Sequence, residues 1–352
     1  MMDTAGVNHR FMGVLVCTCL LAASTACRKD KSQPHAPPRE VVVYTALDRS
    51  FSEPILAEFT RQTGIKVLAQ YDTESTKSVG LANRIRAERH RPRCDVFWNN
   101  EILNTLQLKA EGLLDRCDPP QAANYADRWK DRDGFWYGFA ARARVIIVNT
   151  DLVTDEAFPT SIHDLADPRW RGRTGIAKPL FGTTASHVAC LFAVWGPDRA
   201  TAFLDSLKAN DIRIHAGNKG CATSVGNAAT AFALTDTDDA IIELESGKPV
   251  RIVYPDGAAD GIGTLLLPNT VAVISGAPHR AEAVELINYL LSPEVEERLA
   301  AGPSAQIPLN RLSTPDPRIR GPSQIKTMQV DFEAAAATFS AAREVVEKRF
   351  LE

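Results

Sequence analysis

The sequence lacks the short motifs by which many enzymes and metal sites are recognised. Its 352 residues contain no P-loop, no nucleophile elbow, and no histidine or glutamate motif at catalytic spacing. Histidines such as His163, His187 and His215 occur singly, which is typical of surface or core positions. No cysteines have the CxxC spacing of a zinc site. These absences weigh against an enzyme that depends on such motifs.

An excess of one charge is also missing. The chain has 40 Lys and Arg against 43 Asp and Glu, a net charge of -3, so no basic surface large enough for nucleic acid is implied. The short arginine cluster between Arg84 and Arg93 is typical of a solvated helix face. Hydrophobic residues make up 45% of the chain, and its length suffices for two lobes, each with its own core.

Long apolar runs are absent after the N-terminus, which itself has the composition of an export signal. The run from Phe11 to Ala23 is too short to span a bilayer but is typical of a signal-peptide core. Small residues directly before Cys27 resemble a bacterial lipobox, in which the cysteine is lipidated. We therefore expect a lipoprotein signal peptide and lipobox over residues 1–27, and a polar tether over residues 28–39. The protein would be exported to the periplasm and anchored to a membrane by lipid.

Four cysteines remain after export, and they are Cys94, Cys117, Cys190 and Cys221. They allow three disulfide pairings, between which the sequence does not choose. An oxidising compartment would allow at least one disulfide, whereas buried free thiols are the default interpretation.

From residue 40 onward, strand and helix patterns alternate. Val41–Tyr44 is a short apolar run suited to a buried strand, and a helix that stops at Gly64 separates it from an alternating strand at Ile65–Tyr71. The same alternation continues with strands near 95–98, 143–149 and 265–274 and helices near 78–89, 182–195, 221–232 and 278–293. This order predicts an α/β protein with parallel sheets covered by helices.

Seven short segments carry a more specific signal. They are Val43–Ala46, Phe59–Val67, Asp95–Glu101, Glu111–Leu114, Arg142–Asn149, Asp167–Gly172 and Ile307–Asn310. In this order and at this spacing, they resemble the iron(III)-type periplasmic solute-binding proteins of bacterial ABC importers. The resemblance covers almost the whole mature chain.

The resemblance implies a two-lobed type II periplasmic-binding-protein fold with crossing hinge strands, which captures its ligand as the lobes close. Lobe 1 would comprise residues 40–142 and 265–309, and lobe 2 would comprise residues 143–264 and 310–352. The protein would be a monomer that delivers a small ligand to a permease and an ATPase. The alternative is a ligand receptor for a sensor system.

The ligand positions implied by the resemblance have changed identity. Iron binders of this family use a His after the first strand, a Glu after the third strand and two adjacent tyrosines in the second lobe. These positions fall at Asp48, at Asn100 with Glu101 beside it, and at Thr237 and Asp238. Carboxylates and amides are harder donors, which suit calcium, magnesium or an ammonium group better than ferric iron.

Three carboxylates gather near the tyrosine position. Asp236, Asp238 and Asp239 would repel one another unless a cation or donors lay between them. This pattern favours a wall that recognises a cation, and a metal site there could comprise Asp236, Asp238 and Glu101. Glu74 could supply a second polar wall or cap a helix. The alternatives are that Asp236 caps the next helix and Asp239 is solvated, or that the cluster serves a metal-dependent hydrolase.

Other residues match positions that hold an anion in the family. Thr183 and Thr184 begin a helix where members hold a synergistic anion, and Asn218 falls near another anion contact; each could equally be an ordinary helix cap. Arg142 and Arg144 share one face of a strand, where an ion pair or an anion contact is expected. The expected cargo is a metal ion, with or without an anion, and no resident cofactor. The alternative cargo is a small organic solute bearing an ammonium or phosphate group.

Overall fold

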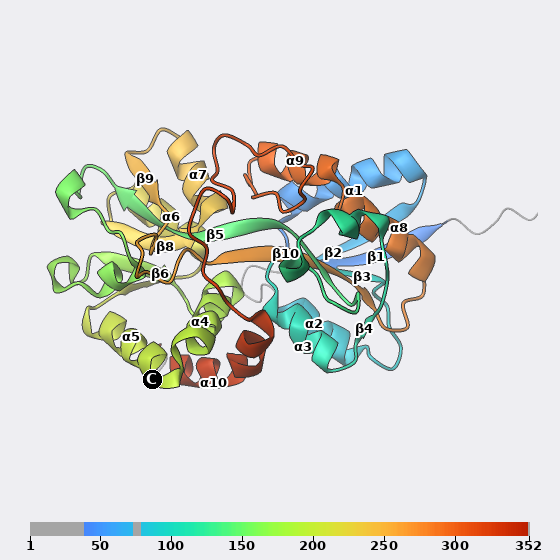
Figure 1. Cartoon of the computed structure of the whole chain (residues 1–352), viewed down its shortest axis with the longest axis horizontal. Helices are drawn as coiled ribbons and strands as arrows, with labels where there is room; N and C mark the ends of the chain where they lie inside the picture. Colours follow the sequence, from blue (N-terminus) through green and yellow to red (C-terminus); the bar gives the residue numbers. More distant parts are fainter. Residues whose placement is uncertain (1–38, 73–78, 351–352) are drawn as a thin grey trace, which may run out of the picture. The chain divides into compact units, whose positions relative to one another are not determined.

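The computed structural model describes residues 39–72 and 79–350, in which strands and helices alternate (Figure 1). The first lobe begins with β1 (Glu40–Thr45), α1 (Arg49–Thr63), β2 (Lys66–Tyr71), α2 (Val79–Ala87), β3 (Val96–Asn99), α3 (Leu103–Ala110) and β4 (Leu114–Asp115). The second lobe contains β6 (Thr174–Ala177), α4 (Gly182–Trp195), α5 (Pro197–Ala209), β7 (Arg213–His215), α6 (Asn218–Gly226), β8 (Phe232–Asp236), α7 (Thr237–Glu245) and β9 (Val250–Val253).

Two long strands, β5 (Tyr137–Asn149) and β10 (Leu266–Ile274), join the lobes. Residues 137–143 of β5 pair antiparallel with β10, whereas residues 144–149 pair with β8 and β9 of the second lobe. The strand order is β2-β1-β3-β10-β5-β8-β6-β7, with β4 on β10 and β9 on β5. This arrangement confirms the predicted two-lobed α/β fold with crossing strands, although the predicted residue limits of the lobes remain a prediction.

The register of these crossing strands is interrupted where they meet. It shifts between Leu267 and Asn269, because Pro268 has no N–H to offer the ladder. Opposite this point, Ala140 has a left-handed backbone with φ 43°. The Asn269 side chain donates a hydrogen bond to the Ala140 carbonyl, so the irregular segment is held by a side chain instead of by the ladder.

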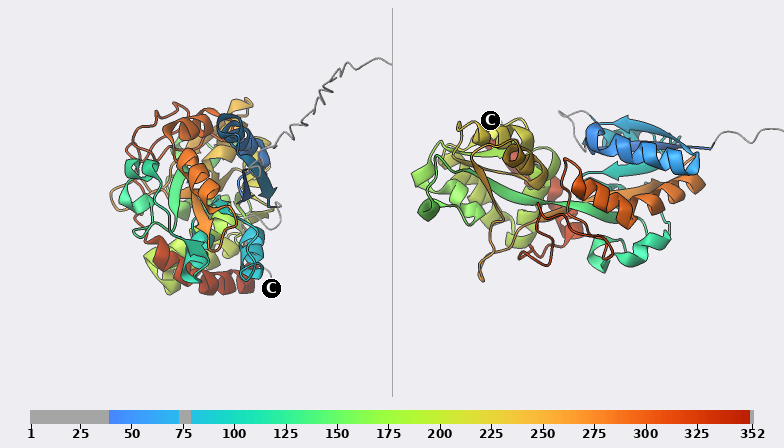
Figure 2. Two further views of the ribbon diagram at one scale, coloured as in Figure 1. Left: turned by 90° about the vertical axis from the view of Figure 1, so that its right-hand side faces the viewer. Right: turned by 90° about the horizontal axis from the view of Figure 1, so that it is seen from above.

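Each strand sends alternate side chains to opposite faces of the sheet, which creates two core layers. Val43 and Trp98 lie in one layer, and their neighbours Tyr44 and Phe97 lie in the other. Helices α1, α6, α7, α8 (Arg280–Leu290) and α9 (Pro293–Ala301) contribute to the first layer. Helices α2, α3, α4, α5 and α10 (Phe332–Phe350) contribute to the second layer, and the views of Figure 2 show this separation around the first lobe.

The helix limits follow their local signals with one clear exception. The predicted helix at 182–195 is confirmed by α4, and α1 ends as expected at Gly64, whose φ is 72°. The prediction of a helix over 221–232 was wrong in both limits. Helix α6 starts at Asn218 and ends at Gly226, because Ala228 turns the chain with φ 58° and Phe232 already begins β8.

The C-terminal helix α10 packs against α4 and α5 of the second lobe and also against α3 of the first. The sequence assigned residues 310–352 to the second lobe, whereas α10 contacts both lobes. Within the described residues, no helix is long and apolar enough to cross a membrane.

The four cysteines of the described residues are all buried, and none forms a disulfide. Burial raises the pKa of the Cys117 thiol to about 11, and it raises the pKa of the other three above their ordinary values as well. These thiols are therefore unreactive core residues in the folded protein. Cys27 lies outside the described residues.

Candidate functional site

The parallel strands determine where polar side chains collect. Strand β1 runs parallel to β2 and β3, and β6 runs parallel to β7 and β8. Ligands of open α/β sheets bind beyond the carboxyl ends of such strands. Asn100 directly follows β3 in the first lobe, and Asp236 ends β8 in the second lobe. Arg142 lies between them on β5.

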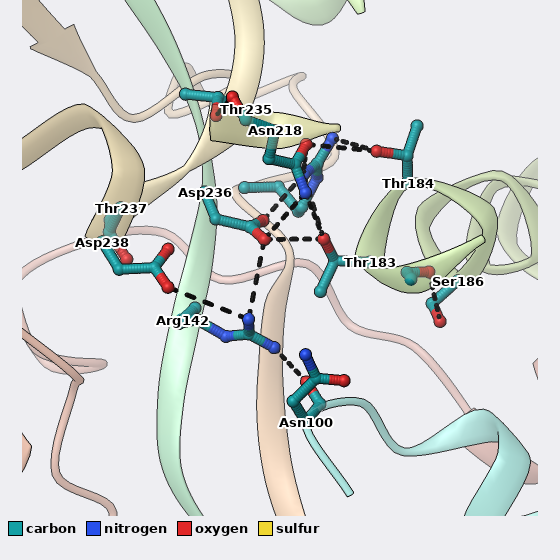
Figure 3. Close-up of polar contacts among 12 residues, drawn as sticks. Asn100, Arg142, Thr183, Thr184, Ser186, Asn218, Thr235, Asp236, Thr237 and Asp238 are labelled. Carbon is teal, nitrogen blue, oxygen red and sulfur yellow. Dashed lines mark hydrogen bonds and ion pairs between the residues drawn. The ribbon is translucent and has the colours of Figure 1, made fainter. Parts of the chain in front are cut away.

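The Asp236 carboxylate lies at the centre of the site (Figure 3). It is 2% exposed and accepts hydrogen bonds from Thr183 Oγ1 at 2.6 Å, Asn218 Nδ2 at 3.0 Å and Arg144 Nη1 at 2.7 Å. Asp236 also stands at the N-cap position of α7 but makes no capping hydrogen bond there. Its side chain therefore bonds to residues of α4, α6 and β5 and not to the helix that follows it.

Arg144 completes this group and is fully buried. Its guanidinium donates hydrogen bonds to Thr183 Oγ1 at 3.3 Å, Asn218 Oδ1 at 2.9 Å and Thr184 Oγ1 at 3.2 Å. The three residues predicted to hold an anion thus do meet in space. They surround a carboxylate of the protein itself, that of Asp236.

Nearby charges keep the buried side chains of Asp236 and Arg142 ionised. Burial alone would raise the pKa of Asp236, but the Arg144 and Arg142 guanidiniums and the Thr183 hydroxyl outweigh burial and hold that pKa below its usual range. Burial alone would lower the pKa of Arg142, whereas Asp238 and Asp236 raise it above its ordinary value. The site therefore contains buried ions that compensate one another.

Arg142 connects the two lobes. It is 4% exposed, and its Nη1 atom lies 3.8 Å from Asp236 Oδ2 and 3.9 Å from Asp238 Oδ2. Its Nη2 atom donates a hydrogen bond to the carbonyl of Asn100 in the first lobe. The expected ion pair at this strand is thus present, and its two carboxylate contacts are longer than hydrogen bonds.

The three clustered aspartates could hold a cation by geometry alone. One carboxylate oxygen of each of Asp236, Asp238 and Asp239 lies within 4.8 Å of the others. Asp238 and Asp239 stand in the first turn of α7, where the helix dipole stabilises negative charge. Because Arg142 and Arg144 already approach this cluster, much of its negative charge is compensated within the protein.

Glu101 has a different environment from the other acidic residues. It is fully buried, and its carboxylate accepts hydrogen bonds from the backbone N–H of Leu103 and Asn104, the side chains of Asn99 and Asn104, and Ser186 Oγ. These donors hold it at the start of α3, where it orders the helix. Its predicted part in a metal site remains a prediction.

The sequence predicts two further candidates. Asp48 is exposed, and its charge is among those that raise the pKa of Arg142, so it faces the same region. Glu74 lies outside the described residues.

Comparisons with known proteins identify the family of the chain. The family model of bacterial extracellular solute-binding proteins matches residues 104–326, well over half of the chain. The chain belongs to this family.

Relatives of this solute-binding protein include iron uptake protein A1 of Synechocystis sp., which is 28% identical over 78% of each chain. A putative 2-aminoethylphosphonate-binding periplasmic protein of Salmonella typhimurium is 24% identical over 72% of each chain. The crystal structure of iron-bound HitA from Pseudomonas aeruginosa covers 88% of this chain and 99% of its own, with a TM-score of 0.79 and 25% identity. The fold is therefore the type II periplasmic-binding-protein fold, and the role of the family is binding rather than catalysis.

Sequence reasoning missed Ser186 of this solute-binding protein, which bonds to Glu101. Ser186 follows Thr183 by three residues on α4, so helical spacing could have placed both on one face. His187, which was interpreted as a surface or core residue, lies in the core. It is 3% exposed, and neither of its ring nitrogens has a hydrogen-bond partner.

Proposed function

We propose that this protein is the exported, lipid-anchored solute-binding component of an ABC importer. It captures a small ligand between its lobes and delivers it, as a monomer, to a permease and an ATPase. The observation that carries the proposal is the position of Arg142, whose guanidinium contacts Asn100 on one side and Asp236 and Asp238 on the other. A ligand held there would touch groups from both lobes at once.

The lobes of this proposal have the limits predicted from the sequence, residues 40–142 with 265–309 and residues 143–264 with 310–352. The ligand-contacting groups would be Arg142, Asp238 and Asp239, with Asp48 and Asn100 opposite. Lipid anchoring would occur at Cys27. The names of the relatives support an import role, since one is an iron uptake protein and another a binding protein of the periplasm.

The charge pattern favours a ligand with one positive and one negative end. Arg142 lies 3.9 Å from Asp238, beyond hydrogen-bond length, so this contact can be replaced at low cost. A positive group would then bind Asp238 and Asp239, and a negative group would bind Arg142. A metal ion bound with a free anion satisfies this description.

A small organic solute satisfies the same description within a single molecule. An ammonium group would face the aspartates, and a phosphate, phosphonate or carboxylate would face the guanidinium. The observation that favours such a solute is that the positive charge of Arg142 and the negative charge of Asp238 lie on neighbouring buried side chains. The Arg142 guanidinium lies between the Asn100 carbonyl and the Asp238 carboxylate. The Salmonella relative is named for a compound of this chemistry.

The test starts from protein purified from the membranes of the bacterium that produces it. Native mass spectrometry and elemental analysis then identify the bound ligand. Calorimetric titration with calcium, magnesium, ferric citrate and 2-aminoethylphosphonate then measures affinity. Asp238→Asn should weaken binding of the identified ligand at least about tenfold, which corresponds to about 1.4 kcal/mol. The control Asp127→Asn changes an exposed aspartate elsewhere and should bind normally. Equal affinity of the wild type and Asp238→Asn would contradict this site.

The sensor alternative is tested genetically. Adjacent genes for a permease and an ATPase, and loss of ligand uptake when the gene for this protein is deleted, are the expected results. Normal uptake in the deletion strain would overturn the import role.

A further inference from the structure

The strongest feature that remains is the complete set of donors around a single carboxylate. Two hydroxyl-bearing residues and an amide, Thr183, Thr184 and Asn218, converge with the guanidinium of Arg144. Thr183 and Asn218 also stand in the first turns of α4 and α6, whose free backbone N–H groups favour negative charge. Such a set has the chemistry of an anion-binding pocket.

We propose that Asp236 is the built-in anion of this pocket. Its carboxylate takes the position that a free anion would occupy, so the protein captures its ligand without a free anion on Thr183, Asn218 and Arg144. This inference deepens the proposed function. It rests on that function only in treating the site as a place where a ligand binds. The negative end of the cargo then belongs on Arg142, not on Arg144.

Two observations distinguish this role of Asp236 from that of a helix cap and from that of a metal ligand. As a helix cap, Asp236 would bond the N–H groups of α7, but its side chain makes no such bond. As a metal ligand, it would need lone pairs that are open to the cation. Three of its roughly four lone-pair sites are already used, because Oδ1 accepts from Arg144 and Oδ2 accepts from both Thr183 and Asn218.

The energetics follow from burial. Arg144 is fully buried, so removal of the Asp236 carboxylate would leave a buried positive charge without its partner. A free anion that entered the wild-type pocket would meet the Asp236 charge and would be repelled. Asp236→Ala should therefore destabilise the protein, and it should also leave room for a small free carboxylate, which the same donors would hold.

The experiment is a chemical rescue with the full-length protein in detergent. Thermal unfolding of the wild type, Asp236→Ala and Asp239→Ala is measured in sodium formate, sodium acetate and, at equal ionic strength, sodium chloride. Asp239→Ala is the matched control, because Asp239 belongs to the same cluster and its replacement also removes one carboxylate there. Asp236→Ala should melt below the wild type in chloride and recover by about 5 °C or more in saturating formate. The wild type and Asp239→Ala should show no specific response to formate.

A wild-type protein that responds to formate as strongly as Asp236→Ala would overturn the proposal, as would a folded Asp236→Ala that formate does not stabilise. If Asp236→Ala folds in neither salt, Asp236→Asn decides, because the amide keeps the shape and removes the charge. That variant should be less stable than the wild type and insensitive to formate. Equal stability of Asp236→Asn and the wild type would overturn the proposal. Because the probe is formate and not the cargo, failure of this test leaves the import role intact.

Discussion

Ser186 on α4 donates a hydrogen bond of 2.8 Å to the Glu101 carboxylate at the start of α3. Both residues are fully buried, and they belong to different lobes. Together with the ion-pair contacts from Arg142 to Asp236 and Asp238, this contact links the lobes on the side where the ligand is proposed to bind.

We expect Ser186→Ala to loosen this contact. A hydrogen bond to a charged group contributes about 1.5–3 kcal/mol, but Glu101 keeps its other donors, so the loss in unfolding free energy should be about 1 kcal/mol. In small-angle scattering, the empty variant should have a larger radius of gyration than the empty wild type. Ser206→Ala removes a serine that bonds only within its own helix and should leave the radius unchanged. An unchanged radius for Ser186→Ala would show that this bond does not restrain the lobes.

Membrane anchoring should depend on one cysteine. Cys27→Ala is expected to move the protein from the membrane fraction to the soluble fraction without altering the melting temperature, because lipid can no longer be attached. Fractionation followed by immunoblotting measures this, and Cys17→Ala, within the proposed signal peptide, is the control that stays with membranes. Retention of Cys27→Ala in the membrane fraction would contradict lipid anchoring.

Ferric iron should produce no visible charge-transfer band in the purified protein. The resemblance to iron binders implies that their two phenolate positions fall at Thr237 and Asp238 here, and Thr237 uses its Oγ1 atom to accept a hydrogen bond from the Ala143 N–H. Titration with ferric citrate, followed by visible absorption spectroscopy, checks this expectation. A coloured complex would mean that another tyrosine supplies the missing phenolate.

The free energy of unfolding should fall at acidic pH because of His187. Burial, and then the charge of Arg144, lowers the pKa of His187 to about 3, so the folded protein keeps this side chain neutral. The unfolded chain binds a proton there below about pH 6.5, and unfolding therefore becomes easier as pH falls from about 6.5 toward 3, by up to about 1.4 kcal/mol per pH unit.

Denaturant titrations at pH 7, 6 and 5 measure this slope. His187→Met should flatten it, because methionine fills a similar apolar space and does not titrate. His90→Asn changes an exposed histidine and should keep the wild-type slope. Identical slopes for His187→Met and the wild type would remove His187 as the cause.

The sequence predicted most of the fold because its signals are local. Helix α4 begins where Gly182 and Thr183 predict it and ends at Gly196, directly before a proline. The prediction for 221–232 was wrong because the small and polar residues after Gly226 have no periodicity that separates a helix from a turn. The turn at Ala228 depends on a left-handed backbone that sequence composition does not reveal.

The compensation of the aspartate charges by arginines could not be predicted from local sequence signals. Asp236 and Arg144 are separated by 92 residues, and only the pairing of β8 with β5 brings them together. Read along the chain, Asp236, Asp238 and Asp239 form an acidic run that favours a bare cation site. In space, two arginines of β5 approach that run, which changes the chemistry expected of its ligand.

Helix α10 has a mechanical consequence for the whole protein. Near its start, Glu333 forms an ion pair of 2.7 Å with Lys109 of α3, and near its end, Arg349 bonds to Asp205 of α5. The helix is thus a third link between lobes that β5 and β10 already connect. Two strands alone would permit bending and twisting in several directions. Because α10 packs against helices of both lobes, opening of the lobes would have to shift these contacts as well as bend β5 and β10.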